Sequence, residues 1–151
     1  MKKIVASSSN VICGFPGIGK EYLGMKHPER ITNINTDTYA WLTPTIRNPK
    51  FPQNYIDAVR ESKGLVLVSS HKDVRECLSK NKVNYSTCYP RLDCKHSYLK
   101  RYRLRGSPEA FVLLMDIMWS DWHRQIREDN RSIANYVLAS HEYISDIVAI
   151  D

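Results

Sequence analysis

The stretch Gly14-Phe15-Pro16-Gly17-Ile18-Gly19-Lys20 constrains the fold of this chain more than any other feature of its sequence. It follows a β-branched run that ends at Cys13 and precedes a helical pattern, and its spacing matches the G-x-x-x-x-G-K part of a phosphate-binding loop. Glycines let successive backbone N–H groups turn toward one anion, the following helix adds its dipole, and Lys20 brings a mobile positive charge. We therefore expect nucleotide phosphates along the loop and the first helical residues: Gly14, Phe15, Pro16, Gly17, Ile18, Gly19, Lys20, Glu21 and Tyr22.

One position after this stretch departs from the usual motif. Glu21 follows Lys20, where a Ser or Thr normally stands whose hydroxyl helps to hold magnesium. A carboxylate also binds magnesium, but it is larger and brings negative charge close to the γ-phosphate oxygens. The third predicted strand ends in Ser69-Ser70, where a magnesium-binding carboxylate commonly stands. We therefore predict that Mg²⁺ is held largely by the nucleotide and water, and we assign no metal ligand to the protein.

Short β-branched runs alternate with amphipathic helical stretches along the 151 residues. This alternation is typical of βαβ units around a mostly parallel sheet, and the length fits a single α/β domain over 1–151. The predicted strands are 3–13, with its buried part at 10–13, then 31–35, 65–69, 83–88 and 134–139. The predicted helices cover the end of the glycine-rich loop to about 26, then 53–62, 72–80 and 107–127.

The last of these helices has the clearest start signal, Ser107-Pro108-Glu109, in which the serine is expected to cap and the proline to occupy the first helical position. Behind it, apolar residues repeat at helical spacing. We expect this stripe to pack in the core and not to line a cofactor pocket; it comprises Phe111, Leu114, Met115, Met118, Trp122 and Ile126.

Asp37 follows the second predicted strand in the segment Asn33-Ile34-Asn35-Thr36-Asp37-Thr38-Tyr39. In a parallel sheet, a residue at the carboxyl end of a strand faces the same crevice as the phosphate loop. Asp37 is thus a candidate general base that accepts a proton from an attacking hydroxyl. The alternative is an aspartate that caps the next turn.

Positive charge is concentrated in one segment. The chain has 22 Lys and Arg against 16 Asp and Glu, a formal charge of +6, and the segment 91–105 contains six of these basic residues and one Asp, a net +5. Arg101 and Arg105 are four residues apart on one helical face, and Gly106 stops the helix. Two guanidinium groups on one face suit a polyphosphate, although a solvated charged helix is an alternative. Tyr98 and Tyr102 interleave with the basic residues and keep a nucleic-acid contact open.

The cysteines and the hydropathy pattern indicate a cytoplasmic protein. No C-x-x-C pair occurs among Cys13, Cys77, Cys88 and Cys94, so reduced thiols are expected, and Cys88, Cys94 and His96 do not match zinc-ligand spacing. The apolar run after Met1-Lys2-Lys3 is too short for a signal peptide, and no stretch is long enough to span a membrane. We expect no membrane partner and either a monomer or a homodimer.

Together these motifs resemble the P-loop kinase family, in particular the phage polynucleotide 5′-kinases and the small phage nucleotide kinases. The resemblance runs through the Lys-Lys-Ile start, the glycine-rich loop, Asn33–Tyr39, the Ser-Ser-His-Lys stretch at 69–72 and Lys-Arg-x-x-x-Arg-Gly at 100–106. It implies a P-loop NTPase three-layer sandwich with a five-stranded sheet in the order 2-3-1-4-5, a helical lid at about 91–106, and location in the host cytoplasm if the protein is phage-encoded.

The resemblance also implies roles for particular residues. Lys20 and the loop glycines would hold ATP phosphates, Asp37 would be the catalytic base, Arg101 and Arg105 would be lid arginines, and the turn around His141 would lie near the adenine. Thr36 and Ala40 stand where the polynucleotide kinases have arginines.

The sequence thus predicts a kinase that uses ATP and Mg²⁺ and phosphorylates a nucleotide, a nucleoside or a nucleic-acid 5′ end. We expect the acceptor in the segment 39–55, where aromatic surface lies beside a cation; the candidate acceptor residues are Trp41, Arg47, Phe51 and Tyr55, with His71 from the third strand end. Two alternatives stay open: a nucleotide-binding module that lacks catalysis because of Glu21, and a basic nucleic-acid-binding protein.

Overall fold

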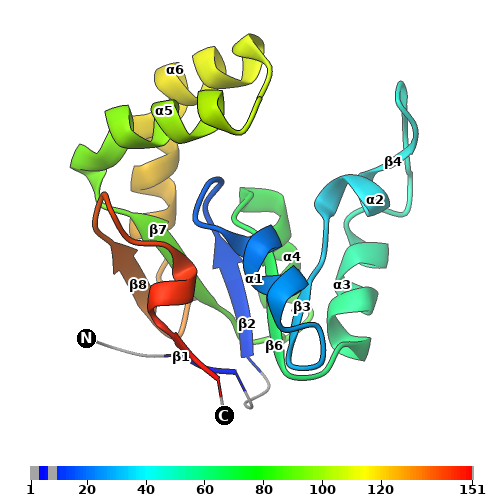
Figure 1. The fold of residues 1–151 in the computed structure, drawn as a ribbon. Coiled ribbons are helices and arrows are strands. Elements are labelled where there is room, and N and C mark those ends of the chain that lie inside the picture. The colour runs from blue at the N-terminus through cyan, green and yellow to red at the C-terminus, as the bar shows by residue number, and fades with distance from the viewer. Residues whose placement is uncertain (1–3, 7–9, 151) are drawn as a thin grey trace.

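The computed structural model describes residues 4–6 and 10–150. Its centre is a five-stranded sheet, in which every neighbouring pair of strands is parallel (Figure 1). The strands are β2 (Asn10–Gly14), β3 (Ile31–Asn33), β6 (Leu65–Ser69), β7 (Ser86–Pro90) and β8 (Asn135–Leu138). Their order, β3-β6-β2-β7-β8, confirms the predicted order 2-3-1-4-5.

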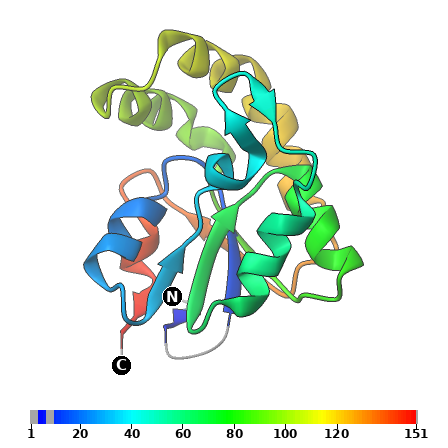
Figure 2. The ribbon, with the colours of Figure 1, turned by 90° about the vertical axis from the view of Figure 1, so that its right-hand side faces the viewer.

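Helices cover both faces of this sheet. The helices α1 (Lys20–Lys26), α5 (Lys95–Leu104) and α6 (Glu109–Arg127) pack on one face, and α3 (Gln53–Glu61) and α4 (Lys72–Lys80) on the other (Figure 2). β6 shows the reason, because Leu65 and Leu67 join the first hydrophobic cluster while Val66 and Val68 join the second. A strand that is buried on both faces has a continuous run of apolar residues. With helices packed on both faces of its sheet, the chain forms the three-layer sandwich of a P-loop NTPase fold.

Several element boundaries differ from the predicted ones. The second strand ends at Asn33, because Asn35 caps the short helix α2 (Thr36–Ala40). The fourth strand begins at Ser86 and not at 83, because the Val83 N–H still bonds to the Leu78 carbonyl at the end of α4. The predicted strand at 3–13 includes residues 3 and 7–9, which lie outside the described residues.

The structure also adds small elements that the sequence pattern did not predict. β1 (Ile4–Val5) pairs in parallel with β9 (Val148–Ala149), and β4 (Trp41–Thr43) pairs antiparallel with β5 (Ile46–Arg47). Two short 3₁₀ turns, η1 (Leu92–Cys94) and η2 (Ile144–Asp146), complete the elements. The β4–β5 hairpin and the α5–α6 pair rise on opposite sides above the carboxyl ends of the strands (Figure 1).

Helix α6 corrects one prediction in detail. Its buried residues are Val112, Met115, Trp119, His123 and Ile126. Leu114 is 46% exposed, and Phe111, Met118 and Trp122 are half-buried, so the core-facing side is rotated from the predicted stripe. Trp119 fixes this rotation, because its indole N–H donates to the Leu92 carbonyl at 2.9 Å.

The start of α6 differs by one position from the predicted one. Pro108 occupies the N-cap, no side chain caps the helix, and the Ser107 hydroxyl instead accepts a hydrogen bond from Arg105 at 2.9 Å. In the described part of the chain, neither α6 nor any other helix combines the length and the apolar character needed to cross a membrane.

The four cysteines are free. Cys13 and Cys88 are completely buried, and this burial raises the pKa of each thiol to about 12. Within residues 4–6 and 10–150, no three His, Cys, Asp or Glu side chains are grouped so that they could hold a metal ion. Cys88, Cys94 and His96 therefore form no such group.

Candidate active site

The glycine-rich loop leaves β2 at Gly14 and enters α1 at Lys20. Gly17 and Gly19 have φ angles of 90° and 96°, in the left-handed region that favours glycine. A Cβ on Gly17 would also come within 2.8 Å of the Tyr102 ring, whose hydroxyl donates to the Pro16 carbonyl at 2.8 Å. The loop is therefore shaped both by its own glycines and by the aromatic side chains of α5 beneath it.

Lys20 folds back over the loop. Its ammonium group donates to the Gly14 carbonyl at 2.6 Å and to the Phe15 carbonyl at 3.3 Å. The pKa of Lys20 is lowered to about 8, chiefly by desolvation on burial, and the positive charge of Arg105 acts in the same direction. Lys20 is thus a half-buried cation whose charge an incoming anion would stabilise.

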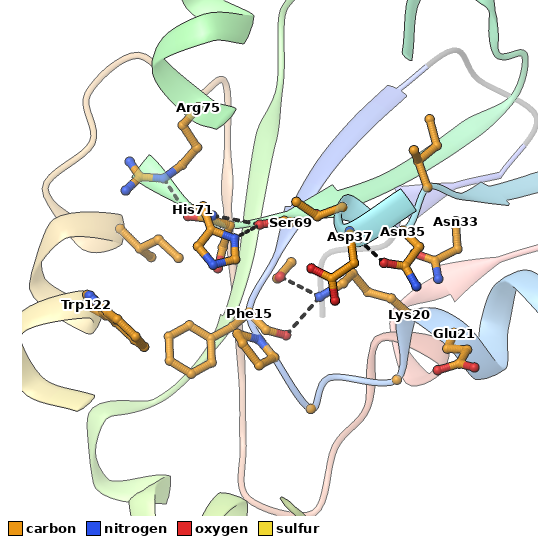
Figure 3. A pocket seen from close by; sticks show the side chains of 18 of the residues that line it. Phe15, Lys20, Glu21, Asn33, Asn35, Asp37, Ser69, His71, Arg75 and Trp122 are labelled. Carbon is orange, nitrogen blue, oxygen red and sulfur yellow. Dashed lines mark hydrogen bonds between the residues drawn. The ribbon is translucent and has the colours of Figure 1, made fainter. Parts of the chain in front are cut away.

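A cavity of about 1010 Å³ opens beside the loop (Figure 3). Ligand sites typically occupy about 300 to 1,000 Å³, so this cavity is at the upper end. The glycine-rich loop and the start of α1 form one wall, the ends of β3 and β6 form the base, and α4 and α6 close the other side. The polar side chains in the lining include Lys20, Glu21, Asn33, Asn35, Asp37, Ser69, His71, Arg75, Arg105 and Gln125.

Asp37 lines this cavity from the first turn of α2. Its backbone N–H donates to the Asn35 side chain at 2.9 Å, so Asn35 is the N-cap of α2. The alternative in which Asp37 itself caps the turn is therefore wrong. The carboxylate of Asp37 is exposed, and Asp37 lines the same cavity as Lys20. This position is expected, because the carboxyl ends of parallel strands face one crevice.

The end of β6 carries Ser69, Ser70 and His71 into the same cavity. The Ser69 hydroxyl bonds to the His71 imidazole Nδ1 and accepts a hydrogen bond from the His71 N–H at 3.0 Å. Desolvation lowers the pKa of His71, so its imidazole is neutral at pH 7. This turn therefore supplies neutral hydrogen-bonding groups where a carboxylate often stands.

A buried ion pair supports this turn from behind. Arg75 donates through Nε to the Ser70 carbonyl at 2.9 Å and through Nη1 to Asp129 at 2.5 Å. Both side chains are buried, and the Tyr85 hydroxyl also donates to Asp129 at 2.7 Å. Burial alone would raise the pKa of Asp129, but these hydrogen bonds, with one from the Arg131 backbone, lower it to about 2.

The segment predicted to bind the acceptor does not line the cavity. Tyr55 is fully buried: its hydroxyl donates to the Ile34 carbonyl at 3.0 Å and accepts from the Ser69 N–H at 3.2 Å. Arg47 stacks on Trp41 and Phe51, with its guanidinium carbon 4.8 Å and 5.4 Å from the ring centres. Trp41 and Arg47 belong to the β4–β5 hairpin and do not line the cavity, and the Tyr55 hydroxyl ties the ends of β3 and β6 together.

The two candidate lid arginines have different surroundings. Arg105 lines the cavity. Arg101 does not, because it donates to the backbone carbonyls of Gly17, Ser140 and Glu142, each at 2.9 Å. Its guanidinium carbon also lies 4.3 Å from the ring centre of Tyr98 and 3.8 Å from that of Tyr143. Arg101 thus joins the glycine-rich loop to the turn after β8.

Two other basic residues of the segment 91–105 are paired with carboxylates of α6. Lys95 pairs with Asp116 at 2.5 Å, and Arg103 lies 3.7 Å from Glu109. Tyr98 and Tyr102 have no exposed surface, so they cannot stack on nucleic-acid bases as the sequence left open. His141 is exposed in the turn after β8 and is not part of the cavity lining.

One side of the cavity was not predicted from the sequence. Phe111, Trp122, Gln125 and Ile126 of α6 line it, although the apolar stripe of α6 was expected to lie in the core. Phe111 and Trp122 are half-buried: they pack against the hydrophobic core and also line the cavity. The stripe therefore has two roles. A periodicity count does not separate these roles, because both require the same apolar side chains.

Comparison with known proteins supports the fold. The structure is similar to the crystal structure of a gluconokinase from Sinorhizobium meliloti 1021, with a TM-score of 0.57 and 12% sequence identity over 95% of this chain and 89% of that chain. An uncharacterized protein from Eubacterium ventriosum ATCC 27560 gives a TM-score of 0.45 at 12% identity, over 96% of this chain and 93% of that one. No protein-family model and no curated protein matches the chain. The likeness to the gluconokinase shows a shared P-loop fold, whereas the resemblance to phage kinases depends on the motifs alone.

Proposed function

We propose that this protein is an ATP-dependent kinase that transfers the γ-phosphoryl group to a nucleotide, a nucleoside or a nucleic-acid 5′ end. One observation carries the proposal: a single cavity combines the glycine-rich loop and Lys20 with the carboxylate of Asp37. The same fold in a gluconokinase supports a kinase in general. The free thiols and the need for ATP fit a cytoplasmic protein.

In this proposal the loop binds the triphosphate. Backbone N–H groups of Gly17, Gly19 and Lys20 would surround the β-phosphate, because Pro16 has no N–H and the Phe15 N–H donates to the Cys88 carbonyl. Lys20 would exchange its bonds to the Gly14 and Phe15 carbonyls for phosphate oxygens. Arg105 adds a second cation from the lid segment 91–106. Arg101 holds the loop against the turn at Ser140–Glu142, and this turn with His141 would border the adenine.

The residues present fit a magnesium ion that enters with the phosphates. Magnesium is usually bound by one or two carboxylates together with phosphate oxygens and water, and Glu21 and Asp37 both line the cavity. Phosphate oxygens and water would hold most of the ion, Asp37 would contact its bound water, and Glu21 would add negative charge beside the γ-phosphate. When bound, the ion would neutralise charge on the β- and γ-phosphates.

Asp37 is the proposed base for a hydroxyl acceptor. The acceptor oxygen attacks the γ-phosphorus, and its proton passes to the Asp37 carboxylate. The new O–P bond forms, the bond from the γ-phosphorus to the bridging oxygen breaks, and ADP leaves. If the acceptor is a phosphate already ionised at pH 7, Asp37 positions the acceptor instead, and Ser69 and His71 offer neutral hydrogen bonds to it.

Two measurements test the proposal. Isothermal titration with Mg·ATP should show binding to the natural protein that Lys20→Ala removes. Transfer from γ-³²P-labelled ATP should then label an acceptor from a panel of nucleosides, nucleoside monophosphates and 5′-hydroxyl oligonucleotides. No ATP binding would refute the proposal at its first step. ATP binding without labelling of any acceptor would favour a nucleotide-binding module, in which Glu21 prevents catalysis.

A further inference from the structure

The side of the cavity farthest from Glu21 is chemically different from the phosphate side. In the view of Figure 3 the rings of Phe15 and Trp122 lie on one side of the cavity, with His71, Asp37 and Lys20 between them and Glu21. Ile126 and Gln125 come from the same face of α6 as Trp122, because positions three and four apart share a helical face. This part of the lining, hereafter the α6 wall, consists of Phe15, Trp122, Gln125 and Ile126.

In the α6 wall, Trp122 and Gln125 are half-buried and present surface to the cavity, Phe15 and Ile126 are almost fully buried, and none of the four side chains is charged. Part of the Trp122 indole therefore faces the cavity. The ring of Phe15 packs edge-on against that of Trp119 in the core, with 5.2 Å between the ring centres. Gln125 contributes one neutral amide, which can donate and accept at the same time. The nearest buried cation, Arg75, is already paired with Asp129 and with the Ser70 carbonyl.

From these contacts we propose that the α6 wall binds a planar heteroaromatic ring of the phosphate acceptor, that is, the base of a nucleoside or nucleoside monophosphate. The ring stacks on Trp122, and the Gln125 amide bonds to its polar edge. Its sugar then extends toward Asp37 and Lys20, which lie between the two ends of the cavity in Figure 3. This inference rests on the proposed kinase function and names its acceptor class.

An open-chain sugar acid suits this wall poorly. Its several hydroxyls need several hydrogen-bonding partners, and its carboxylate needs a cation that is not already paired. Gln125 is the one polar side chain of the wall, Arg75 is neutralised by Asp129, and the cations Lys20 and Arg105 are assigned to the phosphates of ATP. The fold shared with a gluconokinase therefore does not extend to the chemistry of this surface.

The acceptor class is tested by kinetics with matched probes. Labelled ATP is offered with thymidine, deoxycytidine monophosphate, ribose 5-phosphate and gluconate. We expect kcat/KM for a base-bearing acceptor to exceed that for the two probes without a base by about 100-fold. Preference for gluconate or ribose 5-phosphate would overturn the inference while leaving the kinase function in place.

Variants of the wall give the second arm of the test. Base stacking on an aromatic side chain typically contributes about 1 to 3 kcal/mol, so Trp122→Leu should raise the acceptor KM about tenfold or more. Trp122→Phe should retain most of the affinity, and Gln125→Leu should change the preference among bases. None should alter the Kd for Mg·ATP, and Ile117→Ala, on the exposed side of α6, should change nothing. An unchanged acceptor KM in Trp122→Leu would overturn the proposal.

A binding measurement separates this inference from the kinase function. Deoxycytidine monophosphate or thymidine should quench tryptophan fluorescence in the natural protein, and Trp122→Phe should lose this quenching. Circular dichroism confirms that each variant is folded. If no acceptor is phosphorylated, the kinase function fails, but the quenching still decides whether the wall binds a ring. Absence of Trp122-dependent quenching overturns the inference in either case.

Discussion

Lys20 provides the sharpest quantitative prediction, because its pKa couples nucleotide binding to protons. In the free protein, desolvation lowers this pKa to about 8, so at pH 9 only about a tenth of the molecules carry a charged Lys20. Phosphate oxygens would restore the charge by raising the pKa. Between pH 8 and 9.5 the phosphates of ATP are already fully ionised, so proton uptake in that range reports on the protein.

The expected proton uptake and the expected change in Kd follow from the pKa of about 8 for Lys20. ATP binding at pH 9 should take up about 0.9 proton, and the Kd should be about tenfold weaker at pH 9 than at pH 7. Isothermal titration in buffers of different ionisation enthalpy measures this uptake directly. Lys20→Met should bind weakly and without the uptake, whereas Lys63→Met, an exposed lysine before β6, should behave as the natural protein does.

Two results would refute this reasoning. One is a Kd that stays constant from pH 7 to pH 9 in the natural protein. The other is full proton uptake in Lys20→Met, because the proton would then bind elsewhere. Either result would mean that the ammonium group of Lys20 does not exchange its bonds to the loop carbonyls for bonds to phosphate.

Three further predictions concern the site and its support. Glu21→Ser should tighten Mg·ATP binding, since it removes a negative charge beside the phosphates; weaker binding by titration would instead make Glu21 a metal ligand. Asp37→Asn should lower turnover on a hydroxyl acceptor by about 10²-fold or more, and an unchanged rate would remove it as the base. Asp129→Ala should lower the free energy of unfolding by about 3 to 5 kcal/mol in urea titrations, because it leaves a buried guanidinium unpaired. Because the folded-state pKa of Asp129 is about 2, the natural protein should lose stability as the pH falls from about 4 toward 2, and the variant should lack this part of the acid transition.

Much of the fold was predictable because local patterns specify it. The run Leu65–Ser69 is apolar at nearly every position, and it forms β6 with the predicted bounds. Lys72–Lys80 likewise forms α4 as predicted. Both patterns reflect burial that acts residue by residue along the chain. Boundaries shifted where a tertiary bond or a cap intervened, as at Val83 and Asn35.

The candidate site was predictable only in part. The loop and Asp37 share one cavity because the carboxyl ends of parallel strands meet at one edge of the sheet, and the sequence already specified that topology. The cavity lining does not include the predicted acceptor residues at 41–55, because the aromatic and basic residues there form a hairpin in which Arg47 stacks on Trp41. The sequence shows that these side chains are close together along the chain, but it does not show the direction in which the hairpin points.

The sequence by itself determined the main strands and helices and the phosphate loop, because glycine conformations, hydrophobic period and strand ends are local properties. The order of the strands followed from the resemblance to P-loop kinases. Tertiary structure alone decided which side chains meet across the sheet. It set the rotation of α6, so that Trp119 is buried and Trp122 lines the cavity. It also placed Arg101 where it donates to backbone carbonyls, whereas Arg105 lines the cavity. These outcomes depend on the rotation of one helix and on distances between residues far apart in the chain, and no local pattern encodes either.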